Sequence, residues 1–80
     1  MPEASGDDGE RRGLSARNRF AGVVRSVELD GVIGLVEIEA GPHVITAVIT
    51  RKAIEDLGLE PGVEATALIK ATSVMVVRER

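Results

Sequence analysis

Residues 43–62, HVITAVITRKAIEDLGLEPG, contain the change of pattern that decides the fold. The first eight residues are rich in β-branched side chains and predict a strand. The next seven, RKAIEDL, are good helix formers, with Thr50 as the expected N-cap and Gly58 as the expected C-terminal glycine. Pro61-Gly62 then predicts a turn. The stretch therefore predicts a strand followed directly by a helix of about two turns.

Further strands are predicted on both sides of this stretch, because β-branched runs there alternate with turn signals such as Asp30-Gly31. The predicted strands cover residues 20–29, 32–40, 43–50, 63–71 and 73–78, and the helix covers residues 51–57. This is the element order of an OB-type barrel. We therefore predict an all-β fold, a five-stranded OB-like barrel with one short helix between strands 3 and 4. The order of elements along the chain does not determine which strands pair. Five-stranded barrels of other topology therefore fit the same order.

The first thirteen of the 80 residues differ from the rest. Residues 1–13 contain three glycines, four acidic and two basic residues, and no large aliphatic side chain after Met1. Such a segment cannot bury enough apolar surface to offset the entropy of ordering it. We predict a disordered polar N-terminal tail over residues 1–13 and a single folded domain over residues 14–80.

The predicted domain is small, and domains of this size usually need extra stabilisation. The sequence contains no cysteine, one histidine (His43) and one aromatic residue (Phe20), which excludes disulfides and a histidine or thiolate zinc site. Residues 43–50 and 73–78 carry apolar side chains on both strand faces, and such strands need a cover on each side. We expect another subunit to supply the second cover. The alternative is that the barrel simply leaves some aliphatic side chains exposed, which is common.

Charge and composition argue against several classes of function. The net charge is −3, whereas nucleic-acid-binding proteins usually present a basic surface and stack bases on aromatic rings. No apolar run approaches the ~20 residues of a membrane span. The N-terminus lacks the apolar core of a secretory signal, so we expect a cytoplasmic protein. No nucleophile, base and orienting group are arranged together, so we predict that the protein is not an enzyme.

Two short segments contain groups suited to an anion. Ser15-Ala16-Arg17-Asn18 concentrates a hydroxyl, a guanidinium and an amide in an expected irregular segment before the first strand, where an anion nest can form. Lys70-Ala71-Thr72-Ser73 places a lysine and two hydroxyls between the last two predicted strands. Each segment also has an ordinary interpretation, the first as a turn before a strand and the second as a solvated lysine at a strand end.

A family resemblance joins the two segments. LSARN at residues 14–18, ITAVIT at residues 45–50 and ALIKATSVM at residues 67–75 resemble the molbindins, the small Mop-type molybdate-binding proteins. The same module occurs as the TOBE domain of molybdate-responsive regulators and molybdate transporter ATPases. The resemblance covers residues 14–80, and only the tail over residues 1–13 departs from the family.

The resemblance implies a homohexamer, a trimer of dimers, that reversibly binds molybdate, with tungstate as an analogue, between its subunits. Residues of the first segment would form one wall of the site; these are Ser15, Ala16, Arg17 and Asn18. Residues of the second segment, from a neighbouring subunit, would form the other wall; these are Lys70, Ala71 and Thr72. Molybdate offers four acceptor oxygens and no donor, and neither segment contains an Asp or Glu that would repel it. No direct protein ligand to molybdenum and no organic cofactor are expected.

The predicted function is therefore binding of molybdate for intracellular molybdenum storage or homeostasis. A first alternative is a TOBE-type regulatory or interaction module of a molybdate transport or regulatory system. A second is a nucleic-acid-binding OB protein, which the negative charge and the single aromatic residue disfavour.

Overall fold

The computed structural model describes residues 16–79, with only the backbone of Ala16. The chain divides into two compact units. We call residues 20–67 the central unit; residues 1–19 and 68–80 form the terminal unit. The predicted tail over residues 1–13 and the predicted site residue Ser15 lie outside the described residues.

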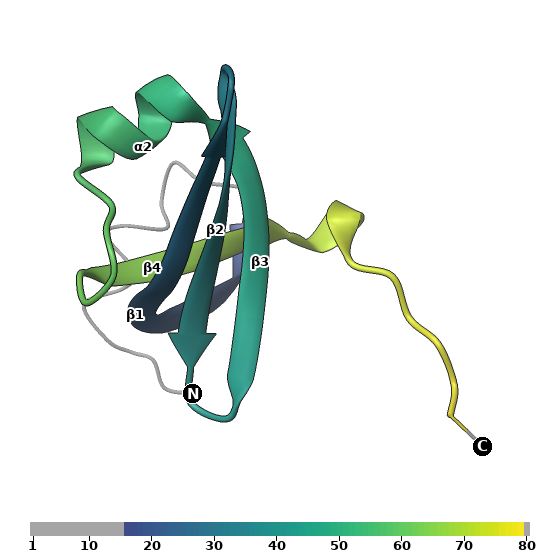
Figure 1. Ribbon diagram of the computed structural model, residues 1–80. Helices are drawn as coiled ribbons and strands as arrows, with labels where there is room; N and C mark the ends of the chain where they lie inside the picture. The colour runs from purple at the N-terminus through teal and green to yellow at the C-terminus, as the bar shows by residue number, and fades with distance from the viewer. Residues whose placement is uncertain (1–15, 80) are drawn as a thin grey trace. The chain divides into compact units, whose positions relative to one another are not determined.

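Four strands form one sheet in the order β3-β2-β1-β4. Figure 1 labels each of them on the ribbon. Their bounds are β1 (Ala16–Asp30), β2 (Ile33–Ala40), β3 (His43–Thr50) and β4 (Glu64–Lys70). β1 and β2 pair antiparallel, as do β2 and β3. The register of β1 against β2 shifts between Val24 and Ser26, which is typical of a β-bulge. The mostly β fold is confirmed, and the predicted strand over residues 43–50 has the observed bounds of β3.

Helix α2 (Arg51–Leu57) begins and ends where the sequence predicts. The hydroxyl of Thr50 accepts a hydrogen bond of 3.0 Å from the N–H of Ala53, which caps the first turn. Gly58 ends the helix with a φ of 65°, a left-handed conformation that glycine adopts without strain. The backbone N–H of Arg51 donates to the carbonyl oxygen of Val32 at 2.8 Å, and this bond fixes the start of α2 beside the β1–β2 turn.

The hydrophobic core lies in the central unit, between the sheet and α2. Its buried residues are Val24, Val36, Ile38, Ala40 and Ile54. In β2 the buried positions alternate with more exposed ones, because successive side chains of a strand point to opposite faces. Ile54 is the buried residue of α2 and packs against the valines and isoleucine of the sheet. The core is small, and twelve large hydrophobic residues are exposed among those that the structure describes.

Gly22 marks a close approach of two strands. A Cβ atom added at Gly22 would overlap the backbone carbonyl oxygen of Glu39. The sequence predicts a bulge or a close approach at this glycine, and the structure shows the close approach. Any other residue at this position would push β1 and β2 apart.

The fifth strand predicted over residues 73–78 is not confirmed. A short 3-10 helix, η1 (Ala71–Ser73), follows β4, and residues 74–79 form neither helix nor strand (Figure 1). The run of valines there favours a strand, but a strand needs a neighbour for its backbone hydrogen bonds. In the part of the chain that the structure describes, the sheet has four strands and residues 74–79 do not pair with it.

Candidate functional site

The terminal unit brings the two predicted anion-binding segments together. The side-chain amide of Asn18 donates a hydrogen bond of 3.1 Å to the backbone carbonyl oxygen of Ile69. Asn18 is the last residue of the first segment, and Ile69 directly precedes Lys70, the first residue of the second. Asn18 is half-buried, so its amide is partly shielded from water. One hydrogen bond therefore connects the segments within a single chain.

The first segment is extended, which corrects one expectation. Ala16, Arg17 and Asn18 lie in β1, which begins at Ala16, four residues before the predicted first strand. The N–H groups of neighbouring residues in a strand point in opposite directions, so these residues do not form a nest of backbone donors. The donors of this segment are instead its side chains, the exposed guanidinium of Arg17 and the amide of Asn18.

The second segment changes conformation at its first residue. Lys70 ends β4, and Ala71 and Thr72 belong to η1, which is closed by a 3.3 Å hydrogen bond from the N–H of Val74 to the carbonyl oxygen of Ala71. Lys70, Ala71 and Thr72 are all exposed. Within residues 16–79, neither Arg17 nor Lys70 forms an ion pair with a carboxylate. Their positive charges are therefore available to an anion.

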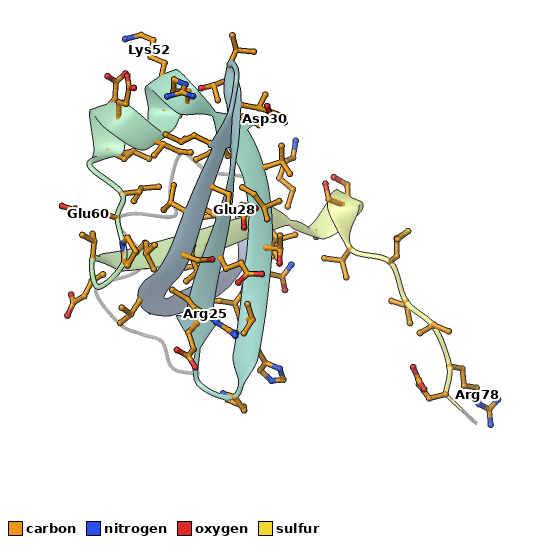
Figure 2. All side chains as sticks on the ribbon, viewed as in Figure 1. Arg25, Glu28, Asp30, Lys52, Glu60 and Arg78 are labelled. Carbon is orange, nitrogen blue, oxygen red and sulfur yellow. The ribbon has the colours of Figure 1, made fainter. Side chains whose placement is uncertain are left out.

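The two units carry opposite charge. The described residues of the terminal unit carry Arg17, Arg19, Lys70 and Arg78 against Glu79, so their net charge is +3. The central unit carries eight carboxylates and three basic side chains, so its net charge is −5. Figure 2 shows three of those carboxylates, Glu28, Asp30 and Glu60. An anion is therefore attracted to the terminal unit, although the chain as a whole is acidic.

A hollow in the central unit is a weaker candidate for an anion. It has a volume of about 630 Å³ and is lined by residues 21–23 of β1 and residues 64–66 of β4. Among the described residues, its lining contains the carboxylate of Glu64 and no basic side chain. A dianion there would meet a like charge with no compensating cation, so the electrostatics favour the terminal unit.

The structure also bears on other kinds of site. Within residues 16–79, no three or more His, Cys, Asp or Glu side chains are grouped so that they could hold a metal ion. His43 is exposed where β3 begins, beside the β2–β3 turn. No helix in the described part of the chain is long and apolar enough to span a membrane.

Sequence reasoning missed the contribution of Ile69. Its side chain gives no sign of a role near an anion, and its carbonyl oxygen matters only because β4 places it beside Asn18. The two residues are 51 positions apart, so local patterns could not show the contact. A prediction that β1 and β4 pair would have been the signal to look for it.

Comparison with known sequences identifies a family. The TOBE domain model matches residues 14–76. A probable molybdenum-pterin-binding protein of Haemophilus influenzae is 45% identical over 64 residues, which cover 79% of this chain and 93% of that protein. Molybdenum-pterin-binding protein 3 of Clostridium pasteurianum is 44% identical over 64 residues, covering 79% of this chain and 94% of that protein.

Solved structures show the same similarity. MopII from Clostridium pasteurianum matches with a TM-score of 0.76 and 36% identity, over 82% of this chain and 100% of that chain. A molybdate-binding protein from Sporomusa ovata matches with a TM-score of 0.78 and 31% identity, over 81% of this chain and 97% of that chain.

A third solved structure is of a longer protein. The cytoplasmic molybdate-binding protein ModG, with molybdate bound, matches with a TM-score of 0.70 and 39% identity over 76% of this chain. The match spans 45% of the ModG chain, so more than half of ModG lies outside it. Together, the family match, the sequence relatives and the structural neighbours show that this chain belongs to the TOBE domain family, as a protein similar to the Mop molybdenum-pterin-binding proteins.

Proposed function

We propose that this protein binds molybdate reversibly, with tungstate as an analogue, at sites formed by its terminal unit between subunits of a homo-oligomer. The observation that carries the proposal is the hydrogen bond from Asn18 to Ile69, which connects the segment containing Arg17 to the segment containing Lys70. The molybdate-binding proteins among the structural neighbours support it.

The donors in the terminal unit suit a tetrahedral dianion. Molybdate accepts hydrogen bonds and donates none, so it binds best to groups that only donate or that can rotate to donate. Arg17 supplies a guanidinium, Lys70 an ammonium group and Thr72 a hydroxyl. Asn18 has two amide N–H groups and uses one for Ile69, which leaves the second for the ligand. Ser15 and the backbone of Ala16 and Ala71 would complete the walls of the molybdate site.

A neighbouring subunit would complete the site. Arg17, Lys70 and Thr72 are exposed in the single chain, where water competes with an anion for every donor. A second copy would exclude water and bring further positive groups to the same dianion. We therefore propose that the first segment of one subunit faces the second segment of another, in a homohexamer built as a trimer of dimers.

The proposed role is storage of molybdenum or control of its level, without catalysis. The relatives described above are named as binding proteins, and ModG is described as cytoplasmic. We propose the same location for this protein. A single folded domain over residues 14–80, preceded by a disordered tail, is the corresponding proposal for its organisation.

A regulatory module is the second candidate, and specific relatives favour it. The molybdenum transport protein ModE of Azotobacter vinelandii is 44% identical over 66 residues, which make up 24% of its length. ModE of Herbaspirillum seropedicae is 47% identical over 64 residues, again 24% of its length. A domain of this kind can thus occur within a larger protein. Co-purification of the tagged protein from its native cells, with and without molybdate, separates the two roles, because a module would retain a specific partner.

Native mass spectrometry of the full chain tests the binding and the assembly together. With molybdate, we expect an oligomer whose mass rises by a fixed number of bound oxyanions, and with sulfate at the same concentration we expect no such rise. A chain that stays monomeric and gains no mass with molybdate would contradict the proposal.

A further inference from the structure

A second hollow lies where β1, β2 and β3 run side by side. Its volume is about 260 Å³, and it is lined by residues 28–30 of β1, residues 33–35 of β2 and Val48 of β3, all in the central unit. Glu28 pairs with Leu35, and Leu35 pairs with Val48, so a carboxylate and two aliphatic side chains form a row across three strands. Asp30 pairs with Ile33, which sets a second carboxylate beside another aliphatic side chain.

Most of this lining lies on the face of the sheet that α2 does not cover. A Cβ atom added at Gly34 would overlap the side chain of Ile54, so Gly34 faces α2. Successive residues of a strand point to opposite faces, so Ile33 and Leu35 face away from α2. Ile33 is 46% exposed and Val48 is 62% exposed. The aliphatic floor of the hollow is therefore open to solvent in the single chain.

The two carboxylates of the hollow have no cation beside them. Glu28 and Asp30 are exposed, and Figure 2 labels both along β1. Within residues 16–79, neither forms an ion pair with a basic side chain. Arg51 lies at the adjacent turn, but its Nε donates a hydrogen bond of 2.6 Å to the carbonyl oxygen of Gly31. Since the described lining contains two carboxylates and no basic side chain, the hollow attracts a cation.

The size and chemistry of the hollow suit one long basic side chain. Pockets that enclose a small organic molecule usually have volumes of about 300–1,000 Å³, and this hollow is smaller. Lysine and arginine combine an aliphatic stem, which packs on apolar surface, with a charged head that stays near water. Here the stem would lie on Leu35 and Val48, and the head would reach Glu28 or Asp30. A purely aliphatic side chain would leave the carboxylates unpaired, and an acidic one would be repelled.

We propose that this hollow binds a lysine or arginine side chain of a different protein and so serves as a docking point for a basic segment. Every described basic side chain of this chain is already engaged or assigned to the proposed oxyanion site. The engaged ones are Arg19, Arg25, Arg51, Lys52 and Arg78, and the assigned ones are Arg17 and Lys70. The net charge of −5 on the central unit would steer a basic partner toward the hollow. Docking uses no residue of the oxyanion site, so it does not depend on molybdate binding.

Titration of the isotope-labelled full chain with a defined peptide, followed by NMR, tests the docking. The probe is acetyl-Gly-Leu-Arg-Leu-Lys-Gly-amide, and the matched control peptide has glutamine in place of its arginine and lysine. We expect saturable shifts of the amide signals of residues 28–35 and Val48, with a dissociation constant at least tenfold lower for the basic peptide than for the glutamine peptide. The absence of shifts at these residues, or equal affinity for the two peptides, would overturn the proposal.

Two double variants separate the hollow from the overall charge. Glu28→Gln with Asp30→Ser removes both carboxylates of the hollow, and Glu60→Gln with Glu64→Gln removes the same charge elsewhere in the central unit. All four side chains are exposed, so the fold should stay intact, which the NMR spectrum checks. We expect the first double variant to weaken binding of the basic peptide at least tenfold and the second to weaken it less than twofold.

Two results with these variants would also overturn the proposal. Equal losses of affinity in both double variants would show that only the overall charge attracts the peptide. A change in the mass of the assembly in the first double variant alone, measured by sedimentation, would show that a second copy of this chain fills the hollow instead of a different protein.

Discussion

Asn18 donates a hydrogen bond of 3.1 Å to the carbonyl oxygen of Ile69, 51 residues further along the chain. The bond joins the first strand of the chain to the last strand of the sheet, each at the residue next to an exposed cation, Arg17 or Lys70. One amide group thus connects the two segments within a single chain, and each segment would contribute one wall to a proposed oxyanion site.

Removing this amide should weaken both the fold and the site. Asn18→Ala loses one partly buried hydrogen bond, so the free energy of unfolding should fall by about 1 kcal/mol. Molybdate affinity should fall by about tenfold, because the ligand loses a donor and the segments lose their connection. Urea unfolding and titration calorimetry measure the two effects. Wild-type affinity in this variant would show that Asn18 has no part in the site.

Arg17→Ala and Lys70→Ala should affect binding much more than stability. Both side chains are exposed, so each substitution should change the free energy of unfolding by less than about 0.5 kcal/mol. Each should weaken molybdate binding by about tenfold or more, because a charge-assisted hydrogen bond is lost. Calorimetric titration of the folded variants gives the affinities.

Lys52→Ala is the matched control for these two substitutions. Lys52 lies on α2 in the central unit, points away from the helix (Figure 2), and forms an exposed ion pair of 3.2 Å with Asp56. The substitution Lys52→Ala should therefore leave molybdate affinity unchanged. Equal affinity losses in all three variants would mean that only overall charge matters and that no local site exists.

Ile54→Ala should be strongly destabilising. Ile54 is 4% exposed and joins α2 to the valines of the sheet, so truncation leaves a cavity that costs about 2–5 kcal/mol. Leu57→Ala on the same helix is the control, because Leu57 is 66% exposed and should cost less than about 1 kcal/mol. Similar urea midpoints for the two variants would show that α2 does not contribute to the core as described.

Gly22→Ala should be more destabilising than Gly34→Ala. At Gly22 the added methyl group overlaps the backbone carbonyl of Glu39, and relief requires the two strands to separate. At Gly34 the nearest atoms are the ends of the Ile54 and Leu29 side chains, which can rotate away. Overpacking typically costs about 1–3 kcal/mol in the free energy of unfolding, and the cost of Gly22→Ala should be at or above the upper end of this range. Thermal unfolding ranks the two variants, and the reverse order would contradict this interpretation.

Local chemistry made much of the fold predictable. Thr50 and Gly58 satisfy backbone groups within a few residues of themselves, so the bounds of α2 follow from nearby sequence. β3 is equally local, because its β-branched residues favour an extended chain, a turn precedes it and α2 follows it directly. The close approach at Gly22 was likewise indicated by a glycine within a strand.

Contacts between distant residues were not predictable in the same way. Serine and asparagine before Phe20 favour a turn, yet β1 begins at Ala16 and Asn18 bonds to Ile69 in the terminal unit. Residues 73–78 have the composition of a strand, but composition does not say which strand they pair with or whether that strand belongs to the same chain. The candidate site was therefore found through its two sequence segments and the family resemblance, while the contact that joins them required the structure.

Isothermal titration of the full chain with molybdate, set against sulfate and phosphate, tests the central claim most directly. At micromolar protein, we predict a saturable heat with molybdate, a similar heat with tungstate, and at least tenfold weaker binding of sulfate and phosphate. No saturable heat with molybdate, or equal affinity for sulfate, would contradict the claim that this protein is a molybdate-binding protein.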